Sequence, residues 1–355
     1  MENSSLYRNR DSFGSQQFVK GLYFYPKPIN TYINKTNCNM IFEDLNYDPS
    51  YEAKLLFECF KNKSEQNIKN IINIIVYNSQ YRLEKINDYF NDSIINDNNL
   101  NLWSIMENQY PKDFCSAVKY IINNQIISDC IDIFNTLKTK NYETLIQIIC
   151  QSNPFRLKIL RAYFNSLYNR DIDNYITEKK DHTDFLGEFS KKLLKGERNS
   201  NFEPNIQRCK KILNDVIENY GEDFETDNRD LMVKIFIDSS PSDIQYIIEN
   251  FNIEQKEDFF NEICENFLKP ELYLIKSLYH SLTHVEKYYS DEIKLYETND
   301  PRFIRTIINC YRHGLMENVK NFYLKENKTN IEEKLKDNTS NEFNLLIKEF
   351  LRNGN

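Results

Sequence analysis

Asp171 and Asp173 alternate in the way that opens an EF-hand, a loop in which acidic side chains surround a calcium ion. Such a loop needs a glycine at its sharp turn and a bidentate glutamate at its end. Ile176 stands at the first of these positions and His182 at the second. We therefore predict that this segment does not bind calcium as an EF-hand.

His280 and His284 are four residues apart, so on a helix their rings would share one face and could hold a zinc ion. Ser281 replaces the glutamate of the H-E-x-x-H motif, and no third ligand is evident. The other histidines are His182 and His313, which leaves few candidates for histidine-based catalysis. Because the sequence also lacks a P-loop and a dinucleotide-binding fingerprint, we predict neither a zinc site nor an enzyme.

The composition indicates which elements must position any site. Glycine accounts for 7 of the 355 residues, about 2%, against a usual share of about 7%. A chain with so little glycine makes few tight turns and builds no glycine-rich phosphate loop, so helices are favoured. The length favours two or three domains or an array of repeats over one small core.

The charge balance bears on partners. The chain has 45 Lys and Arg against 53 Asp and Glu, a formal net charge of −8. Nucleic acids and anionic lipids attract basic surfaces, so this charge argues against nucleic-acid partners and against constitutive attraction to acidic membranes. No apolar run reaches the length of a bilayer span, and the first residues lack a signal-peptide core, so we expect a cytoplasmic protein without a transmembrane segment.

The eight cysteines are scattered along the chain without a C-x-x-C pair, and most have apolar neighbours. A free cysteine in such surroundings behaves as a small hydrophobic residue. We predict buried free thiols rather than disulfides or a metal site.

An internal repeat is the strongest signal in the sequence. Four windows of 24 residues align without a gap, and their starts are 74, 87 and 72 residues apart. Apolar residues occupy six equivalent positions in all four copies, at spacings that give each half of the window one apolar helix face. A polar break with Pro154, Pro241 or Gly314 separates the halves in three copies. Each window therefore predicts a helix, a turn and a second helix; the windows are 67–90, 141–164, 228–251 and 300–323.

Further amphipathic segments lie before and after each window, which gives about five helices in roughly 70 residues, four times over. We predict an all-α protein built from these repeats. An N-terminal tail, residues 1–47, does not join the repeat. The predicted repeats are 48–124, 125–199, 200–283 and 284–355.

The repeat resembles that of the annexins, over Tyr47 to about Leu351. The resemblance rests on four short segments that share the phase of the repeat. It implies four annexin-like repeats of about five helices each, arranged as a curved disc. The segments are 46–50, similar to the F-D-P that opens the annexin core; 79–82, similar to the S-x-x-Q-R turn; and 181–185 and 338–343, similar to the D-T-S-G-x-F segment.

In annexins, calcium lies in a G-x-G-T loop between the first two helices of a repeat, and an acidic residue about 39 positions later completes the ligand shell. Glycines there let backbone carbonyls approach a cation that prefers six to eight oxygens. In this chain all four positions of the second glycine have changed, and Gly221 is the nearby glycine of repeat three. The second-glycine positions are Ser64, Lys138, Glu225 and Glu297.

Repeats three and four keep the best candidates for calcium ligands. Glu265 lies 39 residues after Thr226, and Asp337 lies 39 residues after Thr298. A glutamate also replaces the second glycine in both repeats, so two carboxylates could share an ion; a solvated glutamate near a helix start would equally be favourable by itself. The resemblance implies Gly221, Glu225, Thr226 and Glu265 as ligands in repeat three, and Glu297 and Asp337 in repeat four.

Phe224 and Tyr296 precede the two glutamates. The corresponding apex faces the bilayer in annexins, and an exposed ring there could enter the headgroup region. Packing of these rings in the core is the alternative.

The resemblance implies a peripheral membrane protein that binds acidic phospholipids through calcium, with degenerate calcium loops. The net negative charge suits such a switch, because an added cation would reverse the repulsion from an acidic surface. The alternative on the same fold is a calcium-independent structural or cytoskeletal scaffold with protein partners, by analogy with the annexin-like alpha-giardins of flagellated protists. A location in the cytoplasm and at membranes follows from the first hypothesis.

Overall fold

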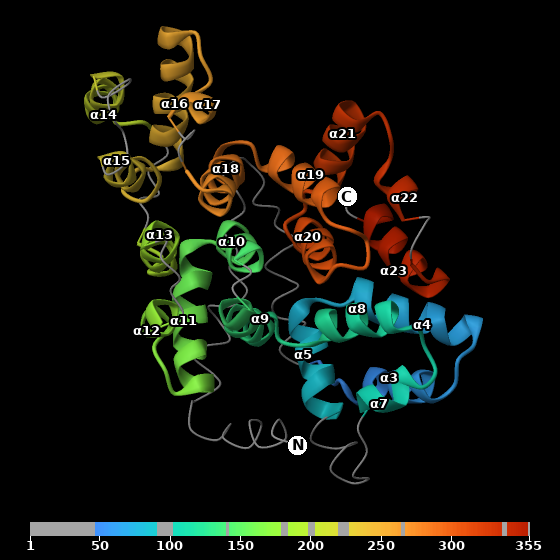
Figure 1. The fold of residues 1–355 in the computed structure, drawn as a ribbon. Helices are drawn as coiled ribbons and strands as arrows, with labels where there is room; N and C mark the ends of the chain where they lie inside the picture. Colours follow the sequence, from blue (N-terminus) through green and yellow to red (C-terminus); the bar gives the residue numbers. More distant parts are fainter. Residues whose placement is uncertain are drawn as a thin grey trace. The chain divides into compact units, whose positions relative to one another are not determined.

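The structure is a computed structural model that describes residues 47–90, 102–139, 142–178, 184–197, 203–218, 227–263, 267–335 and 339–353. Within these ranges it contains about 20 α-helices and no strand (Figure 1). The predicted all-α class is confirmed.

Five described helices fall within each predicted repeat. Repeats one and two comprise α3 (Ser50–Lys61), α4 (Glu65–Tyr77), α5 (Gln80–Tyr89), α7 (Leu102–Glu107) and α8 (Lys112–Ile122), then α9 (Gln125–Thr139), α10 (Glu143–Cys150), α11 (Pro154–Tyr168), α12 (Ile172–Glu178) and α13 (Asp184–Leu194). Repeats three and four comprise α14 (Ile206–Glu218), α15 (Asp227–Phe236), α16 (Pro241–Gln255), α17 (Phe259–Glu262) and α18 (Lys269–Thr283), then α19 (Val285–Leu295), α20 (Pro301–Arg312), α21 (Met316–Asn327), α22 (Ile331–Lys334) and α23 (Asn341–Arg352).

Each 24-residue window forms a helix, a turn and a second helix, as predicted. In the first three copies the turn ends at a polar residue that caps the second helix: the side chains of Ser79, Asn153 and Ser240 each accept a hydrogen bond from the backbone N–H three residues later. Pro154 and Pro241 follow two of these caps, at helix positions where the missing N–H costs nothing.

The six apolar positions of the windows form the interior of every repeat. All of them are buried in all four copies, with side chains no more than 7% exposed. The last of the six is an aromatic residue in each copy: Phe90, Phe164, Phe251 and Tyr323.

The third helices of repeats two, three and four also end alike. Each ends at a residue in the left-handed conformation, with φ of 48° at Asn169, 59° at Lys256 and 60° at Lys328. A left-handed residue after a helix lets the chain turn back and satisfy the last carbonyls. The repetition therefore extends beyond the apolar pattern to backbone geometry.

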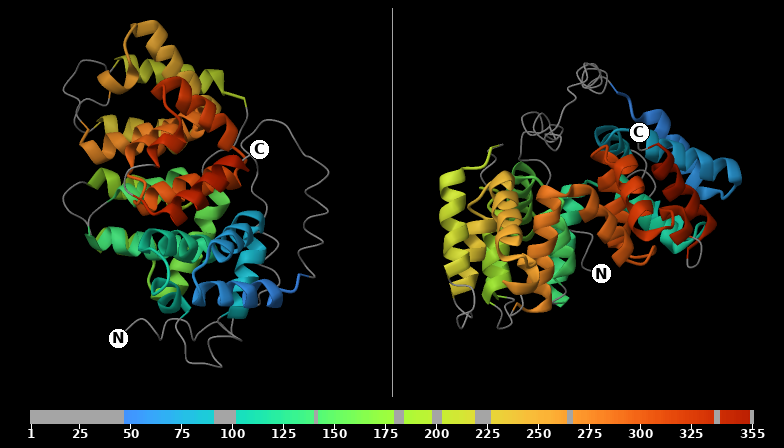
Figure 2. Two further views of the ribbon diagram at one scale, coloured as in Figure 1. Left: turned by 90° about the vertical axis from the view of Figure 1, so that its right-hand side faces the viewer. Right: turned by 90° about the horizontal axis from the view of Figure 1, so that it is seen from above.

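The described helices form two compact units. Unit 1 contains the described residues from Asp129 to Tyr288, and unit 2 contains those up to Ser128 and from Tyr289 onward. In unit 2, the second and fifth helices of repeats one and four pack together: α4, α8, α20 and α23. The equivalent helices of repeats two and three, α10, α13, α15 and α18, pack in the same way inside unit 1, whose helices run beside one another in Figure 2.

A polar network within unit 2 joins repeats one and four and includes Gln125, at the start of repeat two. The guanidinium of Arg312 donates to the side-chain oxygen of Gln125, 3.0 Å away, and to that of Gln80. Gln125 donates in turn to Asn309 at 2.6 Å. These contacts tie α20 to α5 and to the start of α9, because a buried polar group must find its partners within the protein.

No helix in the described ranges is both long and apolar enough to cross a bilayer.

Candidate functional site

The candidate site is the segment between the first and second helices of each repeat, which we call the AB loop. The AB loops are residues 62–64, 140–142, 219–226 and 296–300. In repeat three the whole loop lies outside the described residues, and so do Gly221, Phe224, Glu225 and Thr226. Glu265 and Asp337 also lie outside them, so their predicted role as calcium ligands stays a prediction.

Tyr296 and Glu297 are described in repeat four. The Glu297 side chain is exposed, whereas Tyr296 is only 4% exposed. The guanidinium of Arg302 lies 4.2 Å from the centre of the Tyr296 ring and also pairs with Asp300, the N-cap of α20, at 2.7 Å. The structure thus gives Tyr296 a packing role, and its role at a membrane stays a prediction.

Leu295 is the exposed apolar side chain beside this loop, with 56% of its surface accessible. The periodicity of α19 explains why Leu295 is exposed and Tyr296 is buried. Tyr288, Tyr289, Ile293 and Tyr296 are all buried, a helical spacing that places position 296 on the inner face and position 295 outside. The same periodicity, applied to the sequence, would have selected Leu295 instead of the aromatic residue.

The sequence analysis did not select Lys334, yet its side chain contacts backbone carbonyls just before this loop. Its ammonium lies 2.6 Å from the carbonyl oxygen of Ile293 and 2.7 Å from that of Lys294. The ring of Phe303 lies 5.9 Å away on another side. Burial lowers the pKa of Lys334, and the negative charge of Glu297 acts in the opposite direction.

In repeat one, a tyrosine from a later segment makes the comparable contact. The hydroxyl of Tyr110 donates to the carbonyl oxygen of Cys59 at 2.6 Å, near the end of α3, and a longer contact of 3.4 Å reaches Asn62. The side-chain amide of Asn67 donates to the same Asn62 carbonyl at 2.7 Å. Burial raises the pKa of Tyr110 to about 12, which keeps its hydroxyl protonated as a donor.

Repeat two has a similar contact between a tyrosine hydroxyl and a backbone carbonyl, but the distance is longer. The hydroxyl of Tyr175, on α12, lies 3.4 Å from the carbonyl oxygen of Phe134, near the end of α9. Phe134 and Ile293 each lie four residues before their second-glycine position. In the described parts of repeats one, two and four, a donor from the fourth helix or just after it therefore contacts carbonyls in the last two turns of the first helix.

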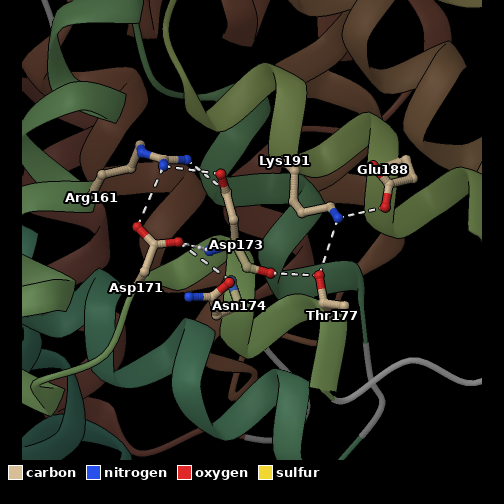
Figure 3. Close-up of polar contacts among 7 residues, drawn as sticks. All are labelled: Arg161, Asp171, Asp173, Asn174, Thr177, Glu188 and Lys191. Carbon is tan, nitrogen blue, oxygen red and sulfur yellow. Dashed lines mark hydrogen bonds and ion pairs between the residues drawn. The ribbon is translucent and has the colours of Figure 1, made fainter.

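Ionic contacts hold α12, which carries Tyr175, in place (Figure 3). Arg161 of α11 makes two hydrogen bonds to the Asp173 carboxylate, at 2.6 and 3.0 Å, and lies 3.6 Å from Asp171. Asp171 accepts from the backbone N–H of Asp173 at 2.8 Å, at the start of the helix. The acidic pair that opens like an EF-hand thus anchors a helix.

The opposite end of α12 is joined to α13 (Figure 3). The ammonium of Lys191 donates to the hydroxyl of Thr177 at 3.1 Å and also pairs with Glu188. Thr177 donates to the backbone carbonyl of Asp173 at 2.8 Å.

The contacts in repeat four bear on whether calcium fits its AB loop. A calcium ion needs six to eight oxygens. The two carbonyls at the end of α19 already accept hydrogen bonds from Lys334, and this set of contacts suits an ammonium rather than a divalent metal. Across the described ranges no group of three or more His, Cys, Asp or Glu side chains could hold a metal ion.

Comparison with solved structures identifies the fold. A mutant of annexin A8 that has an intact N-terminus matches with a TM-score of 0.73 and 13% identity, over 86% of this chain and 95% of that one. Calcium-bound alpha-14 giardin matches with a TM-score of 0.72 and 13% identity, over 86% and 99%. Chicken annexin V in complex with zinc matches with a TM-score of 0.71 and 12% identity, over 86% and 96%.

No family model matches the sequence, and no curated protein matches it. The likeness therefore lies in three-dimensional structure at very low sequence identity. The chain has the annexin fold, in a divergent form, as the repeat pattern predicted.

Proposed function

We propose that the protein binds acidic phospholipid membranes peripherally, with calcium bridging its carboxylates to lipid phosphates. The annexin fold over 86% of the chain is the observation that carries this proposal. Calcium-bound structures of alpha-14 giardin and of annexin (Sm)1 are among the similar ones, which supports a calcium site on this fold. With a net charge of −8, the protein would gain from a bridging cation that offsets its repulsion from an acidic surface.

Repeat three is the place we propose for calcium. Gly221 gives its AB loop a residue that allows close approach of the backbone, and Glu225, Thr226 and Glu265 supply oxygens. Phe224 at the apex would enter the headgroup region. Calcium would supply charge neutralisation there, while the chain's own carboxylates would hold the ion.

Repeat four contributes an apolar contact in this proposal. Leu295 is exposed at the end of α19 beside the exposed Lys294 and Glu297. A leucine at this level can enter the boundary between headgroups and acyl chains, while Lys294 remains among the phosphates.

Cosedimentation with phosphatidylserine vesicles tests the proposal. We expect the protein to pellet with calcium and to stay in the supernatant with a chelator. Glu265→Gln should weaken pelleting, and Leu295→Ala should weaken it more than Leu324→Ala, a control at another exposed leucine. Equal pelleting with calcium and with chelator would exclude calcium control.

The internal contacts of the AB loops favour a second candidate, a calcium-independent scaffold with cytoskeletal partners. Tyr110, Tyr175 and Lys334 contact carbonyls in the last two turns of the first helices, so side chains of the same repeat supply these contacts. Loops held in this way would present the same surface at every calcium concentration. Pelleting with polymerised actin or tubulin, together with no vesicle binding at any calcium level, would favour this candidate over the first.

A further inference from the structure

The ammonium of Lys334 lies in a set of groups that all favour a positive charge. Two carbonyl oxygens, from Ile293 and Lys294, accept its hydrogen bonds at 2.6 and 2.7 Å. The face of the Phe303 ring lies 5.9 Å away, and Glu297 adds a negative charge nearby. Lys334 is on α22, so the contact joins the fourth helix of the repeat to the end of the first.

The position of these carbonyls explains why they attract a cation. The last carbonyls of an α-helix have no partner within the helix, and together they give its C-terminus a partial negative charge. Ile293 and Lys294 are near the end of α19, where this effect is strongest. A half-buried ammonium needs such partners, because burying an unpaired charge is costly.

The same carbonyls lie immediately before the AB loop of repeat four. A metal ion at Glu297 would need backbone oxygens from this neighbourhood in addition to carboxylates. Lys334 already takes two of them and brings its own positive charge, which would repel a divalent cation.

We propose that Lys334 is the resident cation of repeat four: its ammonium takes the backbone oxygens at the end of α19 and holds the AB loop in one conformation without calcium. This inference goes beyond the proposed function, because it concerns the order of a loop and requires neither lipid nor any metal in repeat three. It also distinguishes repeat four from repeat three, since repeat four would expose Leu295 and Glu297 both with and without calcium.

Hydrogen exchange measured by mass spectrometry on the full chain, without lipid, tests the proposal. Two backbone amides report on the loop: Tyr296 N–H donates to the carbonyl of Glu292 at 3.3 Å, and Asp300 N–H donates to that of Glu297 at 3.0 Å. In the wild type we expect the same exchange rate at these amides with calcium and with chelator. Slower exchange with calcium would show that a metal orders the loop and would overturn the proposal.

The variant Lys334→Met keeps the length of the side chain and removes its charge. We expect exchange at the two amides to become about tenfold faster, because the loop loses the contact that closes it. Lys325→Met, an exposed position on α21, is the matched control and should leave the loop unchanged. Equal exchange in the Lys334 variant and the control would contradict the proposal, and the wild-type comparison decides it even if that variant fails to fold.

Discussion

The carboxylate of Asp113 accepts two hydrogen bonds from Ser340, a residue 227 positions later in the chain. The backbone N–H of Ser340 lies 2.7 Å from one carboxylate oxygen, and its hydroxyl lies 2.8 Å from the other. Ser340 is also the N-cap of α23, where its side-chain oxygen accepts from the N–H of Phe343. One aspartate near the start of α8 therefore fixes the start of the last helix and joins repeats one and four within unit 2.

Asp113→Ala should destabilise the protein by about 2–3 kcal/mol, because hydrogen bonds to a charged group contribute more than neutral ones and the Ser340 N–H would lose its partner. Chemical denaturation followed by circular dichroism measures the change. Glu254→Ala, at an exposed position of α16, should change stability by less than about 0.5 kcal/mol. Equal effects of the two substitutions would contradict the importance of this contact.

The buried positions of the repeat can be tested inside one helix. Ile247 of α16 is fully buried at one of the six shared positions, whereas Ile253, on the same helix, is 72% exposed. Ile247→Ala should cost about 2–5 kcal/mol through lost burial and a remaining cavity. Ile253→Ala should be nearly neutral in the same denaturation experiment, and a reversed order would refute the assignment of the helix face.

The raised pKa of Tyr110 predicts that the stability of the folded protein depends on pH under alkaline conditions. Its pKa is about 12 in the folded protein, raised mainly by burial, against the ordinary value of 10.0. The folded state therefore favours the protonated hydroxyl. The resulting stability is complete below about pH 10 and is lost as the pH rises toward 12.

Tyr110→Phe removes the hydroxyl that donates to Cys59, and we expect a loss of about 1–2 kcal/mol at neutral pH. The difference in melting temperature between wild type and variant should shrink above about pH 10. Other tyrosines titrate in both proteins, so the difference isolates Tyr110. A constant difference up to the highest accessible pH would show that ionisation of Tyr110 is not coupled to folding.

Three buried cysteines, Cys115, Cys130 and Cys209, should resist thiol reagents in the folded protein. Burial raises the pKa of the Cys115 and Cys209 thiols to about 12 and also raises that of Cys130. The thiolate is the reactive form, so little of it exists near neutral pH. Peptide mass spectrometry after labelling should find these three cysteines modified only in denaturant, and rapid labelling of any of them in the native protein would contradict their burial.

Periodicity predicted most of the fold because the signal repeats. An apolar residue at one window position says little, but Ile86, Leu160, Ile247 and Val319 at equivalent places each indicate the same buried face, and all four are fully buried. The helix starts at Ser79 and Ser240 carry equally local signals, since a capping side chain acts within three residues.

The contacts at the AB loops could not be predicted in this way. Lys334 lies in a short charged helix that is typical of a solvated surface, and its partners are carbonyls 40 and 41 residues earlier. Every residue has a backbone carbonyl, so the residue types do not show which carbonyls will accept a hydrogen bond from a distant side chain. Tyr296 shows a different difficulty: an aromatic residue beside a loop fits both a membrane contact and the core, and the phase of α19 places it in the core.

The central claim is that calcium binds in repeat three, whereas a lysine ammonium takes the corresponding place in repeat four. A crystal structure of the wild-type protein soaked in calcium tests this claim most directly. The account predicts anomalous difference density within ligand distance of Glu225 and Glu265. It also predicts no such peak at Glu297, with the Lys334 ammonium still in contact with the Ile293 and Lys294 carbonyls. A calcium ion bound at Glu297 with Lys334 displaced, or no calcium at Glu265, would contradict it.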